Sequence, residues 1–98
     1  MARFPDTVRV PQIGWNAIAI TRNHPVLAGV PDNSYCYFVN SYYAQPHPTD
    51  VLTRTDYAAP FASMIARDNV VATQFHAEKS GPVGLRMLAN FARWDGTP

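Results

Sequence analysis

The sequence predicts an α/β fold of mostly antiparallel strands followed by one amphipathic helix at the C-terminal end. Two observations support this fold class. Short runs rich in β-branched and aromatic residues recur through most of the chain, and turn-forming residues separate them. The segment 83–94 instead has apolar residues at helical spacing. At 98 residues, the chain makes one small domain or part of a larger one.

The first half of the chain is expected to hold two strands. Residues 1–12 contain two prolines and should form a loop or an edge segment. Residues 13–20 are predicted to be a short strand, and residues 23–31 one helical turn between loops. The aromatic run 35–44 is well suited to a strand, which the proline-rich segment 45–50 ends.

The second half continues with strands over 51–57, 61–67 and 70–75. Asp68 and Asn69 form a plausible two-residue hairpin turn, because both residue types tolerate positive φ. The helix over 83–94 closes the chain. One helix can cover only one face of such a sheet. We therefore expect the domain to be incomplete and to need a second copy or another polypeptide.

Composition excludes several classes of function. Hydrophobic residues make up 47% of the chain and charged residues 15%, which favours a folded core. The net charge of +1, with scattered arginines, indicates no nucleic-acid partner. No apolar run approaches the roughly 20 residues that span a bilayer, and no signal peptide is evident. A single cysteine, Cys36, fits a reducing, cytoplasmic compartment.

The segment Gln74–Ser80 contains the most informative residues. It holds the only glutamate, Glu78, and the only lysine, Lys79, of the chain. His76 and Glu78 follow an apolar strand, at the kind of sheet edge where α/β proteins bind ligands. A histidine that acts as a base needs a carboxylate to hold its tautomer. The pair is therefore a candidate for acid–base chemistry.

Four blocks resemble class I (triad-type) glutamine amidotransferases, and most closely the glutaminase subunit of imidazole glycerol phosphate synthase. Residues 10–16 resemble a segment that contains Pro-His-Met-Gly-Trp-Asn, and residues 37–43 resemble Tyr-Phe-Val-His-Ser-Tyr. Residues 74–80, Gln-Phe-His-Ala-Glu-Lys-Ser, resemble Gln-Phe-His-Pro-Glu-Lys-Ser. Residues 84–91 are similar to the family's C-terminal helix. The blocks occur in the family's order and cover nearly the whole chain.

The resemblance implies that residues 1–98 are the C-terminal half of such a domain. It implies glutamine as substrate, no cofactor, and a cyclase subunit that receives the ammonia for histidine biosynthesis. His76 would be the triad base and Glu78 would orient it. Trp15, Tyr37 and Lys79 match positions on the face that meets the cyclase. The alternative for Trp15 and Tyr37 is simple packing within the sheet.

Two features of the family are missing from the chain. These are the Gly-x-Cys-x-Gly motif that carries the nucleophile and the glycines of the oxyanion hole. Gln12 and Asn40 stand where the family often has histidine, and Ala77 stands where it has proline. The chain alone is therefore expected to be inactive, and a separate N-terminal half would have to supply the thiol. Cys36 lacks a glycine elbow and is expected to be a small packed residue.

Two further interpretations remain open from the sequence. One is a non-enzymatic assembly module that forms a homo-oligomer, and the other is a functionless relic. His24 and His47 each precede a proline and are expected to be solvated loop residues. With Cys36 and His76 they show none of the usual metal-ligand spacings, so no metal site is predicted.

Overall fold

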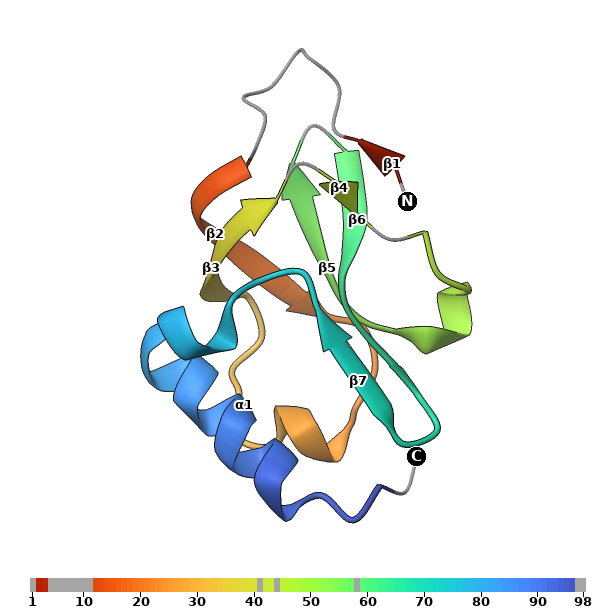
Figure 1. Ribbon diagram of the computed structural model, residues 1–98, viewed down its shortest axis with the longest axis vertical. Coiled ribbons are helices and arrows are strands. Elements are labelled where there is room, and N and C mark those ends of the chain that lie inside the picture. The colour runs from red at the N-terminus through yellow and green to blue at the C-terminus, as the bar shows by residue number, and fades with distance from the viewer. Residues whose placement is uncertain (1, 4–11, 41, 44, 58, 97–98) are drawn as a thin grey trace.

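The computed structural model describes residues 2–3, 12–40, 42–43, 45–57 and 59–96. Its main sheet has five strands in the order β3-β2-β5-β6-β7, and every neighbouring pair is antiparallel. One α-helix packs beside this sheet (Figure 1). The predicted α/β class, with antiparallel strands followed by a C-terminal helix, is therefore confirmed. The five strands are β2 (Gln12–Ile20), β3 (Ser34–Asn40), β5 (Val51–Tyr57), β6 (Ala59–Arg67) and β7 (Val70–Thr73).

The aromatic run 35–44 forms two short elements and not the single strand expected from its composition. β3 ends at Asn40, and β4 (Tyr42–Tyr43) pairs with β1 (Ala2–Arg3) in a separate two-stranded sheet. The expected edge segment is thus present at residues 2–3. The remainder of that segment, residues 4–11, lies outside the described residues.

The β6–β7 hairpin forms as predicted. Its turn lies at Asp68 and Asn69, and Asp68 has a φ of 52°. β7 ends at Thr73, two residues earlier than expected. Phe75 instead makes an isolated antiparallel bridge to Phe38 on β3, and the two rings lie 5.7 Å apart. The chain therefore leaves β7, at one edge of the sheet, and crosses toward β3 at the opposite edge (Figure 1).

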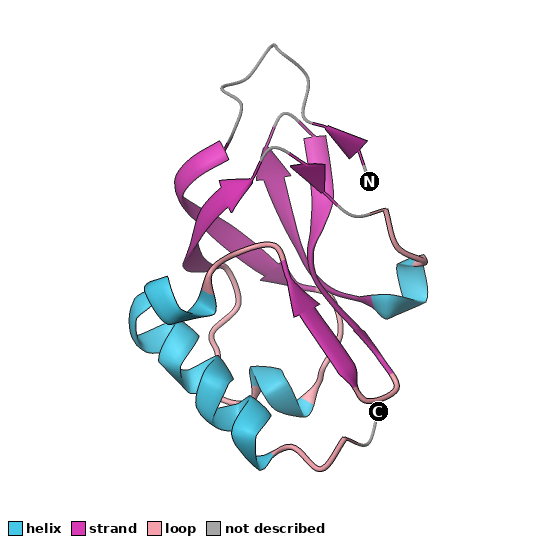
Figure 2. Ribbon diagram, in the orientation of Figure 1, coloured by secondary structure: helices cyan, strands magenta, loops and turns pink. Residues whose placement is uncertain are grey.

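Within the described residues, three single-turn 3-10 helices occupy connections between the longer elements. Figure 2 draws them in the same cyan as the α-helix. They are η1 (Pro25–Leu27), η2 (Pro48–Asp50) and η3 (Ala77–Lys79). A histidine stands at the N-cap position of each turn.

The C-terminal helix α1 (Gly81–Arg93) begins two residues before the predicted start, because proline is tolerated in a first helical turn. Gly84 and Met87 are buried against the rest of the domain, whereas Leu85, Leu88 and Phe91 are exposed. Asn90 donates hydrogen bonds to the carbonyls of Val26 (2.9 Å) and Ala28 (2.8 Å). These bonds fix the helix onto η1.

The core lies between the sheet, η1 and the inner face of α1. Its fully buried side chains include Ile18, Cys36, Phe38, Leu52 and Met64. Most of the exposed large apolar side chains lie on two surfaces. One is the outer face of the β2–β3 hairpin, where Ile13, Trp15, Tyr35 and Val39 are exposed; the other is the outer face of α1. Uncovered apolar surface of this kind fits the expectation that the domain packs against a further chain.

Candidate functional site

The central pair of the candidate site is His76 and Glu78, on the turn between β7 and α1. His76 is the N-cap residue of η3, and Glu78 lies within that turn. The Nδ1 atom of His76 lies 2.8 Å from Oε1 of Glu78. Both side chains reach solvent, with exposed fractions of 44% for His76 and 60% for Glu78. The structure thus brings together the two residues that the sequence predicted as a pair.

The proton positions of this pair follow from the chemistry of its partners. Hydrogen bonds from the Glu78 backbone and from His76 hold the pKa of the Glu78 carboxyl below its usual value, so this carboxylate is ionised at neutral pH. An ionised carboxylate can only accept a hydrogen bond, so Nδ1 of His76 must be the donor. The neutral imidazole then has a free lone pair on Nε2, as a general base requires.

Backbone hydrogen bonds attach the turn to the sheet. The N–H of His76 donates to the carbonyl of Tyr37 on β3 at 2.9 Å. Within the turn, the N–H of Lys79 donates to the carbonyl of His76 at 3.0 Å, and that of Ser80 to the carbonyl of Ala77 at 3.1 Å. These contacts hold His76 at the edge of the five-stranded sheet.

A hollow of about 270 Å³ opens beside the pair, between β7, η3 and α1. His76 and Glu78 contribute its polar wall. Most of the remaining wall is apolar, with Val71, Phe75, Met87, Leu88 and Phe91 among the lining residues. The pair therefore stands at the rim of an apolar depression.

The three predicted interface residues also gather near the turn. The rings of Trp15 and Tyr37 meet edge to face, with centroids 5.9 Å apart. The indole of Trp15 reaches toward Gly81, which has a φ of 65° and leads from η3 into α1. Trp15 is 54% exposed, Tyr37 is half-buried and Lys79 is exposed. Trp15 therefore packs against Tyr37 and is also partly open to solvent.

Cys36, the only cysteine of the chain, is fully buried on β3. Burial raises the pKa of its thiol to about 11, although the nearby Ser80 hydroxyl partly opposes the rise. A buried thiol that stays protonated at neutral pH is a poor nucleophile. The expectation that Cys36 is a packed residue is confirmed.

His24 corrects one prediction from the sequence. It is only 7% exposed and is not a solvated loop residue. Trp94, just after α1, covers it with a ring contact of 4.9 Å, and such a tertiary contact cannot be read from the local pattern. Burial, and then the positive charge of Arg22, lower the pKa of His24. His47 is exposed, as predicted.

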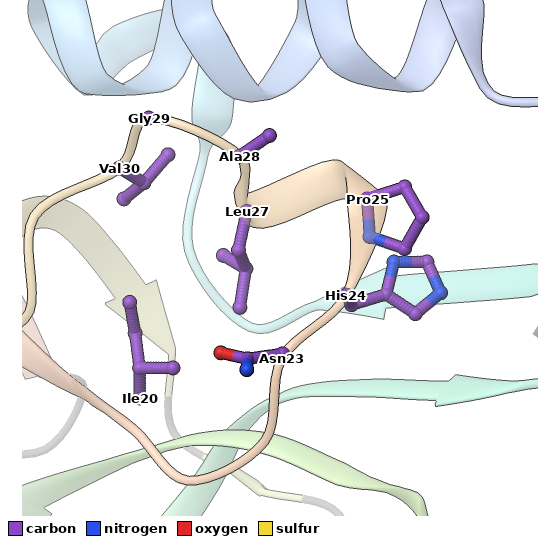
Figure 3. A pocket seen from close by; sticks show the side chains of 8 residues that line it. All are labelled: Ile20, Asn23, His24, Pro25, Leu27, Ala28, Gly29 and Val30. Carbon is purple, nitrogen blue, oxygen red and sulfur yellow. The ribbon is translucent and has the colours of Figure 1, made fainter.

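A second hollow, of about 460 Å³, lies along the loop that contains η1 (Figure 3). Ile20, Leu27 and Val30 form part of its wall. The imidazole of His24 lies beside Pro25, apart from Ile20 and Val30 (Figure 3). None of the predicted site residues lines this hollow, so it plays no part in the candidate site.

The described residues contain no group of three or more histidine, cysteine, aspartate or glutamate side chains placed to hold a metal ion. No helix among them is long and apolar enough to cross a membrane.

Several curated relatives of the chain share one name. The chain is 49% identical over 89 residues to "Imidazole glycerol phosphate synthase subunit HisH" of Azospirillum brasilense. It is 53% identical over 97 residues to the HisH subunit of Chloroflexus aurantiacus, and 54% identical over 92 residues to that of Halobacterium salinarum. No protein-family model matches the chain.

These alignments cover 90% to 94% of this chain but only 42% to 46% of each relative. The chain therefore spans less than half the length of the curated relatives that it matches. It is a homologue of part of the HisH subunit, and its fold is consistent with part of a class I glutamine amidotransferase fold.

Proposed function

We propose that this homologue of part of HisH supplies the acid–base half of a glutaminase that delivers ammonia for imidazole glycerol phosphate synthesis in histidine biosynthesis. The main support is the 2.8 Å contact between His76 Nδ1 and Glu78 Oε1, which leaves Nε2 free to accept a proton. The contact occurs within the block that resembles the family's triad segment. Neither His24 nor His47 has a carboxylate partner at this position.

His76 and Glu78 have separate roles in the proposed reaction. Nε2 of His76 takes the proton from a cysteine thiol, and the thiolate attacks the side-chain amide carbon of glutamine. The protonated imidazole then gives a proton to the departing ammonia, and water releases glutamate from the thioester. Glu78 holds the ring orientation and stabilises the imidazolium.

The nucleophile must come from a second polypeptide segment, because Cys36 is buried and protonated. The apolar hollow beside His76 and Glu78 is a suitable docking surface for that segment. Leu88 and Phe91 line the hollow and are exposed in this chain. Covering them would bury apolar surface and bring the thiol to the pair. Without this segment we expect no hydrolysis of glutamine.

The cyclase subunit would bind on a different surface, the exposed face of the β2–β3 hairpin. Trp15 and Tyr37 offer large aromatic area there, and Lys79 adds a positive charge on the adjacent turn. Aromatic residues surrounded by polar groups are typical anchors of protein interfaces. This arrangement would place the site where ammonia passes to the partner.

The test is complementation with a polypeptide that carries the Gly-x-Cys-x-Gly half. We expect no glutamate release from either purified chain alone and steady release from the mixture. His76→Ala in this chain should abolish that release. Glutamate release by the 98-residue chain alone, lost in His76→Ala, would contradict the requirement for a second segment. A well-folded mixture without activity would contradict the proposed function.

A homodimeric assembly module is the second candidate, and the two exposed apolar surfaces favour it. A second copy could cover the outer face of α1 in place of the nucleophile segment. Analytical ultracentrifugation separates the two candidates. A stable symmetric dimer that the nucleophile half does not dissociate favours the module, whereas a monomer that forms a one-to-one complex favours the split enzyme.

A further inference from the structure

Ser80 stands at the N-cap position of α1 but does not cap the helix. Serine is a preferred residue at this position because its hydroxyl can accept a hydrogen bond from the first helical turn. Here the side chain makes no such bond. Its Oγ accepts a hydrogen bond from the N–H of Tyr37 at 3.0 Å and donates one to the carbonyl of His76 at 2.6 Å. Ser80 is only 2% exposed.

These bonds tie both backbone groups of His76 to one residue of the sheet. The N–H of His76 donates directly to the carbonyl of Tyr37. The carbonyl of His76 is linked to the N–H of Tyr37 through the Ser80 hydroxyl. β3 is an edge strand, and among the described residues this N–H of Tyr37 bonds to the Ser80 hydroxyl and not to another strand. The closed loop of bonds fixes the peptide groups on both sides of the His76 Cα, and so the direction of its side chain.

Gly84 allows α1 to close over this loop of bonds. A Cβ atom at position 84 would lie 1.8 Å from the carbonyl oxygen of Ala77 and 2.9 Å from Cβ of Ser80. Any side chain would therefore push the helix away from the turn. The N–H of Gly84 also lies 3.4 Å from the carbonyl oxygen of Ser80, with which it makes a hydrogen bond.

We propose that Ser80 and Gly84 are positioning residues, which hold His76 in register with Glu78. This inference rests on the proposed function, in which the pair performs the proton transfer. A base must keep its geometry to within about half an ångström to be effective. The hydrogen bonds of Ser80 and the close approach of α1 at Gly84 provide this geometry with residues of the present chain. The pair is thus preorganised before any nucleophile segment docks.

The test compares Ser80→Ala with Ser63→Ala in the 98-residue chain. Ser63 is a matched control, because its buried hydroxyl makes its hydrogen bond to Thr53 and not to the turn. Nitrogen NMR of labelled imidazoles reports the tautomer of His76 in alkaline solution. We expect one tautomer, protonated at Nδ1, in the wild type and in Ser63→Ala. In Ser80→Ala we expect a mixture of both tautomers.

Hydrogen exchange provides the second measurement. In Ser80→Ala the Tyr37 amide should exchange about tenfold faster relative to the Ala62 amide, because one hydrogen bond is lost. In Ser63→Ala this ratio should not change. An unchanged His76 tautomer and an unchanged Tyr37 ratio in a folded Ser80→Ala would overturn the inference, and so would equal effects of the two substitutions.

The wild-type chain still decides the question if Ser80→Ala does not fold. The Tyr37 amide should then exchange as slowly as amides in the central strands. Exchange at the rate of an exposed amide would show that Ser80 does not hold it. Both readouts are independent of catalysis. An inactive complemented enzyme would therefore contradict the proposed function but leave the NMR and hydrogen-exchange results unchanged. Conversely, a failed NMR and hydrogen-exchange test would contradict the positioning role of Ser80 but not the proposed function.

Discussion

The three 3-10 turns of this protein begin alike but use their histidines differently. In η1 and η2, Nδ1 of His24 and of His47 accepts a hydrogen bond from the backbone N–H two residues later. In η3, Nδ1 of His76 makes no such cap and meets the Glu78 carboxylate. The residue two positions after the histidine is valine in η1, threonine in η2 and glutamate in η3.

The comparison teaches that the partner of Nδ1 decides what Nε2 can do. A capping Nδ1 is an acceptor, so the neutral ring must place its proton on Nε2. In His24 this Nε2 is also buried and, within the described part of the chain, has no hydrogen-bond partner. A donating Nδ1 has the opposite effect and leaves Nε2 as an acceptor. Among these three turns, only the one with a glutamate therefore leaves Nε2 as an acceptor.

The largest expected effect on activity comes from replacing Glu78, the residue that distinguishes η3 from η1 and η2. Glu78→Gln lets the side-chain amide donate to Nδ1, which moves the imidazole proton to Nε2. In the complemented enzyme we expect glutamate release to fall by about 10²- to 10⁴-fold. Thr49→Val changes the matching position of η2 and serves as the control, with activity unchanged. Equal activity of Glu78→Gln and the wild type would show that the carboxylate does not set the tautomer.

The next effect concerns Cys36, the single cysteine of the chain. The pKa of the Cys36 thiol is raised to about 11 in the folded chain. We therefore expect a thiol reagent at neutral pH to label Cys36 about 100-fold more slowly in the folded chain than in the chain unfolded by urea. Mass spectrometry of the time course measures the rates. Rapid labelling of the folded chain would show that the Cys36 thiol is accessible and reactive, and Cys36 would again be a candidate nucleophile.

His24 should contribute more than His76 to the stability of the fold, although His76 is the more important of the two for the proposed activity. His24→Ala removes the cap of a buried turn and should lower the free energy of unfolding by about 1–2 kcal/mol. His76→Ala removes an exposed pair and should lower the free energy of unfolding by less than His24→Ala does. Urea denaturation compares the two variants. A larger loss for His76→Ala would mean that its pair with Glu78 is mainly structural.

The smallest expected effect is a pH dependence of the free energy of unfolding that arises from His24, the N-cap residue of η1. The pKa of His24 is lowered in the folded protein from its ordinary value of 6.5, so the unfolded chain binds more protons once the pH falls toward that value. The contribution of His24 to stability is therefore complete above this region and declines as the pH falls below 6.5. His24→Asn retains a capping group without a titrating ring and should flatten the curve there. An unchanged slope in this variant would mean that His24 titrates alike in both states.

The Glu78 carboxyl acts in a lower pH range. Its folded pKa lies below the ordinary value of 4.5, so its contribution to stability is present above that value and is lost as the pH falls through the folded pKa. The contributions of His24 and Glu78 can therefore be told apart by measuring the free energy of unfolding as a function of pH.

Local patterns predicted the strands and the His76–Glu78 pair because both depend on residues close together in sequence. The hairpin turn at Asp68 and Asn69 is an example. Burial of His24 could not be predicted, because it depends on Trp94, which is distant in the sequence. The role of Ser80 was also missed, because serine before a helix is the usual sign of a cap. The N–H that donates to its hydroxyl belongs to Tyr37 on β3, and the carbonyl that accepts from it belongs to His76 at the start of the preceding turn.

Nitrogen NMR of the three imidazoles, at about pH 9 where unperturbed histidines are neutral, tests the central claim most directly. The account predicts that His76 carries its proton on Nδ1, whereas His24 and His47 carry theirs on Nε2. His76 protonated on Nε2 like the other two would contradict it, because its Nε2 could then accept no proton from a thiol.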